Sequence, residues 1–200
     1  MGRKLLAGIL GGFAFFAWSG LAHMVLPLGE TGVRELPNEQ AITTVMKGNL
    51  PERGLYLFPG TGLPANATRA QKSAAMDQQF QKTATGPSGL LMYHPARPVS
   101  FGQMLMTECA TNIVQLLLAV FLLGQTSLAG FGARWGFITV TGILAAISTN
   151  VSYWNWYGFP GNYTLAYTST IAMGFLVAGL VAAAIMKPGA GMRAARAAGA

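Results

Sequence analysis

Four long apolar stretches dominate the pattern of hydrophobic and polar positions along the 200-residue chain. Each is close to or above the roughly 20 residues that a helix needs to cross the hydrocarbon core of a bilayer. They cover residues 5–28, 101–124, 135–153 and 163–186. The polar segment 29–100 holds most of the charged residues and seven of the ten prolines. The pattern predicts an all-α integral membrane protein, a four-transmembrane-helix bundle with a small α+β extracytoplasmic segment between helices 1 and 2.

The same pattern divides the chain into four parts. We expect transmembrane helix 1 in residues 1–28, the extracytoplasmic segment in 29–100, transmembrane helices 2–4 in 101–186 and a cytoplasmic tail in 187–200. The tail is rich in Ala and Gly, and we expect it to be disordered because it has little apolar surface to bury.

The first apolar stretch has two interpretations. A basic start, an apolar core and the small residues of Gly20-Leu21-Ala22 are typical of a signal peptide, in which case residues 1–22 are removed. A retained helix is favoured by a row of small and polar side chains on one helical face, which suits packing against another helix. This row is Gly8, Gly12, Ser19 and His23.

Short periodic runs predict the structure of the segment 29–100. Residues 37–48 have the apolar spacing of a short helix, and 67–83 form a polar, alanine-rich run typical of an exposed helix. Residues 55–58 and 90–93 are apolar runs bounded by Gly and Pro, which predicts two strands. About 70 residues rarely build an independent core, so we expect this segment to lie on the membrane surface or on a partner.

Composition and charge agree with a membrane location. The chain is 52% hydrophobic and only 10% charged, whereas soluble domains average about 25% charged residues. The net charge of +7 does not indicate nucleic-acid binding, because the basic residues are scattered and several flank the apolar stretches. These flanking residues are Arg3, Lys4, Arg134, Lys187, Arg193 and Arg196. The positive-inside rule then places both termini in the cytoplasm and 29–100 outside a plasma or bacterial inner membrane.

Few familiar chemistries fit the chain. The single cysteine, Cys109, excludes an intrachain disulfide and a CxxC redox pair. The sequence contains no P-loop, dinucleotide fingerprint, GxSxG or CxxCH motif, so it identifies no cofactor.

The second apolar stretch carries the most informative polar residues. Its one carboxylate, Glu108, shares a narrow helical arc with Thr111, Asn112 and Gln115. An ionisable group in hydrocarbon costs roughly 2.5–3.5 kcal/mol on insertion scales, so this arc should face protein or a wet cavity. We expect the opposite, apolar face, which includes Ile113 and Leu117, to contact lipid.

Polar residues near the outer ends of the other stretches extend this arc into a predicted pocket. His23 lies at the outer end of the first stretch, and Ser148 and Ser152 lie in the outer half of the third. We predict a pocket that opens outward, lined by Glu108, Thr111, Asn112, Gln115, His23, Ser148 and Ser152. Its candidate metal ligands are His23, His94 and Glu108, since carboxylate and imidazole bind metals. The alternative is that these polar groups only hold the helices together through hydrogen bonds.

Without a catalytic motif, the sequence favours a non-enzymatic function. We expect a membrane binding or accessory subunit whose outer segment and pocket engage a partner protein or a lipid-like ligand. Its expected partners are membrane lipids and other membrane protein subunits, or a second copy of the chain, and not nucleic acid. The alternative is an integral membrane enzyme or a proton- or ion-coupled permeation unit that uses Glu108.

Overall fold

The computed structural model describes residues 2–186, and the predicted tail 187–200 lies outside the described residues. Within them the chain divides into two compact units. One contains the residues up to Arg34 and those from Ser100 onward, and the other is Glu35–Val99.

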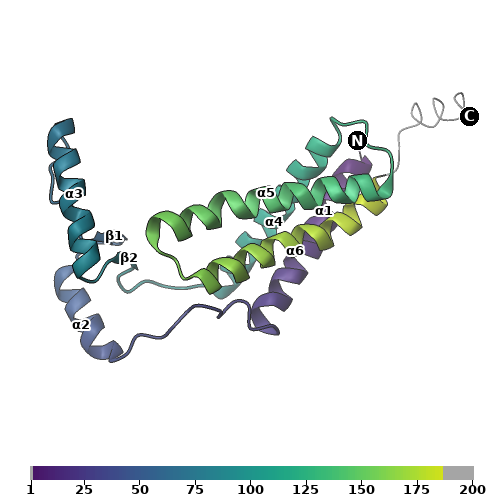
Figure 1. The fold of residues 1–200 in the computed structure, drawn as a ribbon. Coiled ribbons are helices and arrows are strands. Elements are labelled where there is room, and N and C mark those ends of the chain that lie inside the picture. Colours follow the sequence, from purple (N-terminus) through teal and green to yellow (C-terminus); the bar gives the residue numbers. More distant parts are fainter. Residues whose placement is uncertain (1, 187–200) are drawn as a thin grey trace, which may run out of the picture. The chain divides into compact units, whose positions relative to one another are not determined.

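The first unit consists of four helices, α1 (Gly2–Met24), α4 (Phe101–Leu123), α5 (Phe131–Tyr157) and α6 (Gly161–Ile185) (Figure 1). Each is long and apolar enough to cross a membrane, as the sequence predicts. The first ends four residues earlier than the apolar stretch, because the chain turns where the stretch reaches Pro27.

One boundary prediction is wrong. The third apolar stretch ends at residue 153, but α5 continues to Tyr157, so the aromatic residues Trp154, Trp156 and Tyr157 belong to its last turns. The helix continues through them because no breaker occurs before Gly158, whose left-handed backbone (φ 70°) ends it.

The extent of packing differs strongly between pairs of the four helices. Helix α1 packs extensively on α4 and α6, and α6 packs extensively on α5. Helices α4 and α5 follow each other in the sequence, yet they contact each other only sparsely. The bundle is therefore open along one side, between α4 and α5.

Glycines on α1 permit its close contact with α4. A side chain at Gly8 would overlap Leu117, and one at Gly12 would overlap the backbone of Ile113. This corrects the expectation that the Ile113–Leu117 face meets lipid, because the absence of side chains on the glycine row lets α1 cover that face.

Large and small residues interlock at the centre of the unit. The ring of Phe15 lies where a side chain at Gly174 would be, and the ring of Phe175 lies where one at Gly142 would be. The two phenyl rings also meet edge to face, with their centroids 5.1 Å apart. These contacts fix α6 against both α1 and α5.

The two ends of the four-helix unit differ in chemistry. At the basic end, where α4 and α6 finish, Lys4 Nζ donates to Gly124 O at 3.4 Å and Arg134 Nη2 donates to Ala183 O at 3.1 Å. Both cations satisfy carbonyl groups at or near a helix C-terminus, where positive charge is favoured. At the aromatic end lie Tyr153 and Tyr157 of α5, Phe159 of the α5–α6 turn and Tyr163 of α6.

The second unit contains α2 (Glu39–Asn49), β1 (Gly54–Phe58), α3 (Arg69–Thr85) and β2 (Gly89–Tyr93). Both predicted helices and both predicted strands are confirmed, and the strands pair antiparallel with Tyr56 opposite Leu91. A capping box, in which the Thr68 and Gln71 side chains bind each other's backbone N–H groups, starts α3. Only Ala67 and Ala75 are buried hydrophobic residues in this unit, so its core is very small.

Candidate functional site

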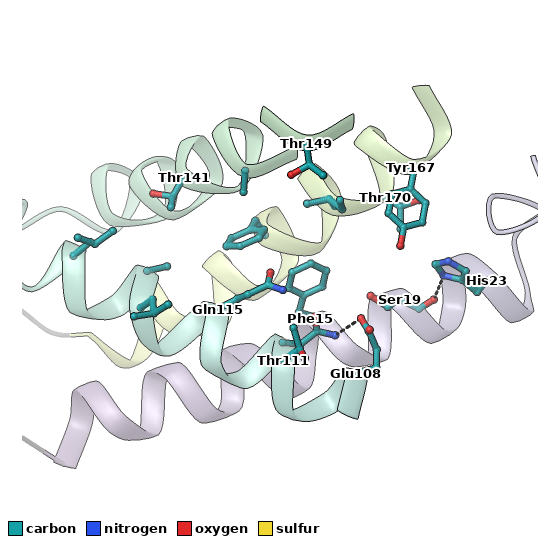
Figure 2. A pocket seen from close by; sticks show the side chains of 17 residues that line it. Phe15, Ser19, His23, Glu108, Thr111, Gln115, Thr141, Thr149, Tyr167 and Thr170 are labelled. Atoms are coloured by element: carbon teal, nitrogen blue, oxygen red, sulfur yellow. Dashed lines mark hydrogen bonds between the residues drawn. The ribbon is translucent and has the colours of Figure 1, made fainter. Parts of the chain in front are cut away.

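A cavity of about 450 Å³ lies along the open side of the four-helix unit, and we call it the lateral cleft (Figure 2). Its size is within the usual range of ligand pockets, about 300–1,000 Å³. All four helices contribute to its lining, which comprises Phe15, Ser19, His23, Glu108, Thr111, Asn112, Gln115, Leu118, Ala119, Leu122, Thr141, Ala145, Thr149, Tyr167, Thr170, Ile171 and Phe175. The cleft exists because α4 and α5 diverge while α1 and α6 remain packed beneath them.

The lateral cleft is polar at one end and apolar towards the other. Towards the aromatic end of the bundle its lining includes Glu108, Ser19, His23 and Tyr167, which Figure 2 shows close to one another. Along α4 the lining then changes from these polar groups to Leu118, Ala119 and Leu122. Leu118 and Leu122 are both about half exposed, so the apolar part of the cleft is open to the side.

A hydrogen bond within α4 orients the carboxylate of Glu108. Asn112 Nδ2 donates to Glu108 Oε1 at 3.2 Å, one helical turn away. Asn112 is almost fully buried, at 1% exposure, whereas Glu108 is exposed. The buried amide therefore anchors a carboxylate that faces the accessible space of the cleft.

A hydrogen bond within α1 sets which ring nitrogen of neutral His23 carries the hydrogen. Its Nδ1 lies 2.9 Å from Ser19 O, and because a carbonyl oxygen can only accept, Nδ1 must carry the hydrogen. In the neutral ring Nε2 is therefore a hydrogen-bond acceptor. The ring meets Tyr167 edge on, with a centroid separation of 6.3 Å.

A column of aromatic rings leads from the α5–α6 turn to the cleft. Tyr153 stacks on Phe159 at 5.4 Å, Phe159 lies 5.6 Å from Tyr163, and Tyr163 stacks on Tyr167 at 5.5 Å. The last ring, Tyr167, lines the cleft. These contacts restrict the orientation of Tyr167 beside His23.

The structure brings together the predicted residues of α1 and α4 but not those of α5. Glu108, Thr111, Asn112, Gln115 and His23 all line the lateral cleft. Their role in binding stays a prediction. The hydrogen bond of Glu108 is to its own helix, although polar groups from the other three helices line the same cleft.

Ser148 and Ser152 do not line the cleft. Both are exposed, and Ser148 Oγ donates to Ala145 O in its own helix. From α5 the cleft is instead lined by Thr141, Ala145 and Thr149, at a spacing of four residues. The sequence contains this spacing, but neighbouring rows of the same helix also carry small polar residues, so periodicity does not choose between them.

The predicted list of lining residues also left out those of α6, which are Tyr167, Thr170, Ile171 and Phe175. Thr170 is buried, and its hydroxyl donates to Ala166 O at 2.9 Å. The sequence shows the polar Thr170 within an apolar stretch, but this alone does not indicate which helix Thr170 faces.

The described residues offer no ready metal centre. Among residues 2–186 no group of three or more His, Cys, Asp or Glu side chains could hold a metal ion. His94, the third candidate ligand, belongs to the second unit, where it lines a separate cavity of about 370 Å³ with Lys47 and Tyr93. Metal binding by His23, His94 or Glu108 thus remains a hypothesis without a ligand set.

Comparisons with protein-family models, curated proteins and solved structures gave no match. The function is therefore inferred from the chemistry and geometry of the lateral cleft.

Proposed function

We propose that the chain is an integral membrane protein that binds a lipid-like ligand in the lateral cleft. In this proposal it acts as a binding or accessory protein rather than as an enzyme. The observation that carries the proposal is the division of the cleft into a polar end, at Glu108 and His23, and an apolar side, at Leu118 and Leu122. A lipid-like molecule has the same division, with a polar head and an apolar chain.

The orientation is part of this proposal. The basic end, with Lys4 and Arg134, lies in the cytoplasm according to the positive-inside rule. The aromatic end, with the exposed Trp154 and Trp156, then lies at the outer interface, where Trp is enriched. In this arrangement the polar part of the cleft is near the outer headgroups and its apolar part is at the depth of acyl chains.

A second role, contact with a partner, is favoured by the small core of the second unit. Leu55, Met92 and Phe80 are 66%, 69% and 63% exposed, which is a large apolar surface for a unit of this size. Contact with another membrane subunit or with a second copy of the chain would cover it.

Filling the cleft tests the main proposal. Ala145 lines the cleft and is exposed, so Ala145→Phe should block it without disturbing the core. Ala110 is also exposed but does not line the cleft, and Ala110→Phe is the matched control. We expect the amphiphiles that copurify with the wild-type protein to be lost from Ala145→Phe and retained by Ala110→Phe, as measured by native mass spectrometry. Equal retention by both variants would contradict binding in the cleft.

Glu108→Gln separates this proposal from the enzyme and permeation alternatives. A binding protein keeps its assembly and its ability to hold an apolar chain when the carboxylate becomes an amide. Proton transfer or ion permeation through Glu108 is abolished by the same change. Proton flux measured in vesicles that contain the wild-type protein, and lost in Glu108→Gln, would favour the alternative.

A further inference from the structure

The charges that line the lateral cleft are of one sign. Among the described residues 2–186, Glu108 is the only acidic residue that lines the cleft, and neither Lys nor Arg lines it. Lys4 and Arg134 bind carbonyl groups at the basic end of the unit. The polar end of the cleft therefore offers a carboxylate to a ligand but no lysine or arginine that would favour a phosphate or sulfate group.

Three threonine hydroxyls and His23 of the cleft are acceptors for a further hydrogen bond, whereas the Gln115 amide and the Tyr167 hydroxyl can also donate one. The hydroxyls of Thr111, Thr141 and Thr170 already donate to backbone carbonyls of their own helices, at 2.8, 2.8 and 2.9 Å. Each hydroxyl has a single proton, so these groups can only accept a further hydrogen bond. His23 uses Nδ1 to donate to Ser19 O, which leaves Nε2 of the neutral ring as another acceptor.

Aromatic rings lie beside Glu108 and His23 at the polar end of the cleft. Tyr167 lines the cleft, stacks on Tyr163 through one face and lies nearly perpendicular to the ring of His23. A cation near the face of such a ring is attracted by the ring quadrupole, and carboxylates and aromatic rings together bind ammonium groups in proteins.

From these observations we infer that the lateral cleft selects amphiphiles with a positively charged ammonium head. The head binds between Glu108 and Tyr167, and the alkyl chain lies along Leu118 and Leu122. This inference rests on the proposed function, because it assumes that the cleft binds an amphiphile and adds the charge of the head.

Three probes with the same alkyl chain test the inference on the full-length protein in a neutral detergent. They are an alkyltrimethylammonium, its neutral carbon isostere with a tert-butyl head, and an alkyl sulfate. We expect wild-type protein to bind the ammonium probe about tenfold or more tightly than the neutral one, which is the scale of one desolvated cation–π or charge-assisted contact. The sulfate probe should bind least. Native mass spectrometry measures the three affinities.

Variants of Glu108 and Tyr167 test which side chains cause the preference for the ammonium probe. Glu108→Gln should bring the affinities for the ammonium and neutral probes close together by weakening the affinity for the ammonium probe. Tyr167→Leu should weaken the ammonium affinity more than Tyr167→Phe, which keeps the ring. Equal affinities for the ammonium and neutral probes in the wild type would overturn the inference of charge selection.

The same probes test the proposed function separately from the charge preference. If the neutral probe binds the wild type and Ala145→Phe abolishes that binding, the cleft binds amphiphiles whatever the charge preference. If no probe responds to Ala145→Phe, the proposed function itself fails, and the inference fails with it.

Discussion

Helix α4 packs very differently against its two neighbours, α1 and α5, although both are apolar enough to cross a membrane. Helix α1, more than 75 residues away in the sequence, lies against α4 so closely that Gly8 and Gly12 have no room for a side chain. Helix α5 follows α4 after a short loop and barely touches it, so the lateral cleft opens between them. Between apolar helices in lipid, packing depends on small residues and polar contacts rather than on hydrophobicity, and α4 has such contacts only with α1.

The largest effect on stability should come from adding a side chain at the tight α1–α4 contact. Gly12→Leu places a side chain against backbone atoms of Ile113, which cannot move aside as a side chain can. We expect a loss of stability of about 3 kcal/mol, at the upper end for overpacked cores. Gly20→Leu is the control, because nothing lies within 4 Å of its added Cβ. Unfolding in detergent measures both variants, and a similar loss in each would contradict the close contact.

A smaller effect is expected at the basic end, where cations join pairs of helices. Arg134 is 7% exposed and binds Ala183 O through Nε and Nη2, so Arg134→Met leaves carbonyl groups without their partner. We expect it to cost about 2 kcal/mol, as for hydrogen bonds to charged groups.

Lys4→Met provides the comparison for Arg134. Lys4 makes one exposed bond of 3.4 Å to Gly124 O, so its loss should cost about 0.5 kcal/mol or less. Equal costs for the two substitutions, measured by the same unfolding experiment, would show that burial of Arg134 does not matter.

The smallest effect on stability should come from the open side. Ala145 has no tight neighbour to displace in the lateral cleft, so Ala145→Phe should change the free energy of unfolding by no more than about 0.5 kcal/mol, as for other surface substitutions. A destabilisation as large as that of Gly12→Leu would mean that α4 and α5 pack together and leave no open cleft.

The sequence predicted the parts of the fold that depend on local chemistry. The length of the four apolar runs gave the helices, and the arc of Glu108, Asn112 and Gln115 gave the polar face of α4. The small residues Gly8 and Gly12 correctly indicated a face of close contact on α1. Each of these features follows from composition and helical periodicity alone.

Other parts depend on the rotation of each helix about its axis, which periodicity does not fix. Of the observed lining residues, Thr141 lies on nearly the same helical row as the predicted Ser148, whereas Ala145 and Thr149 lie a fraction of a turn away. The choice between these arcs follows from the contact of Phe175 with Gly142, which sets the rotation of α5 on α6. The sequence also gave no indication that α1 covers Ile113 and Leu117, because apolar side chains suit lipid and protein equally.

The central claim, that the lateral cleft holds a ligand that the rest of the surface does not, can be tested by crosslinking from within the helix. A photoreactive leucine analogue at Leu118 lies in the cleft, whereas one at Phe121 lies on the same helix outside it. The two positions are almost equally exposed, at 58% and 60%, so exposure alone gives them similar contact with lipid. Mass spectrometry of the adducts formed in native membranes should find one amphiphile enriched at Leu118 and the bulk lipid mixture at Phe121. The same mixture at both positions would contradict a ligand site between α4 and α5.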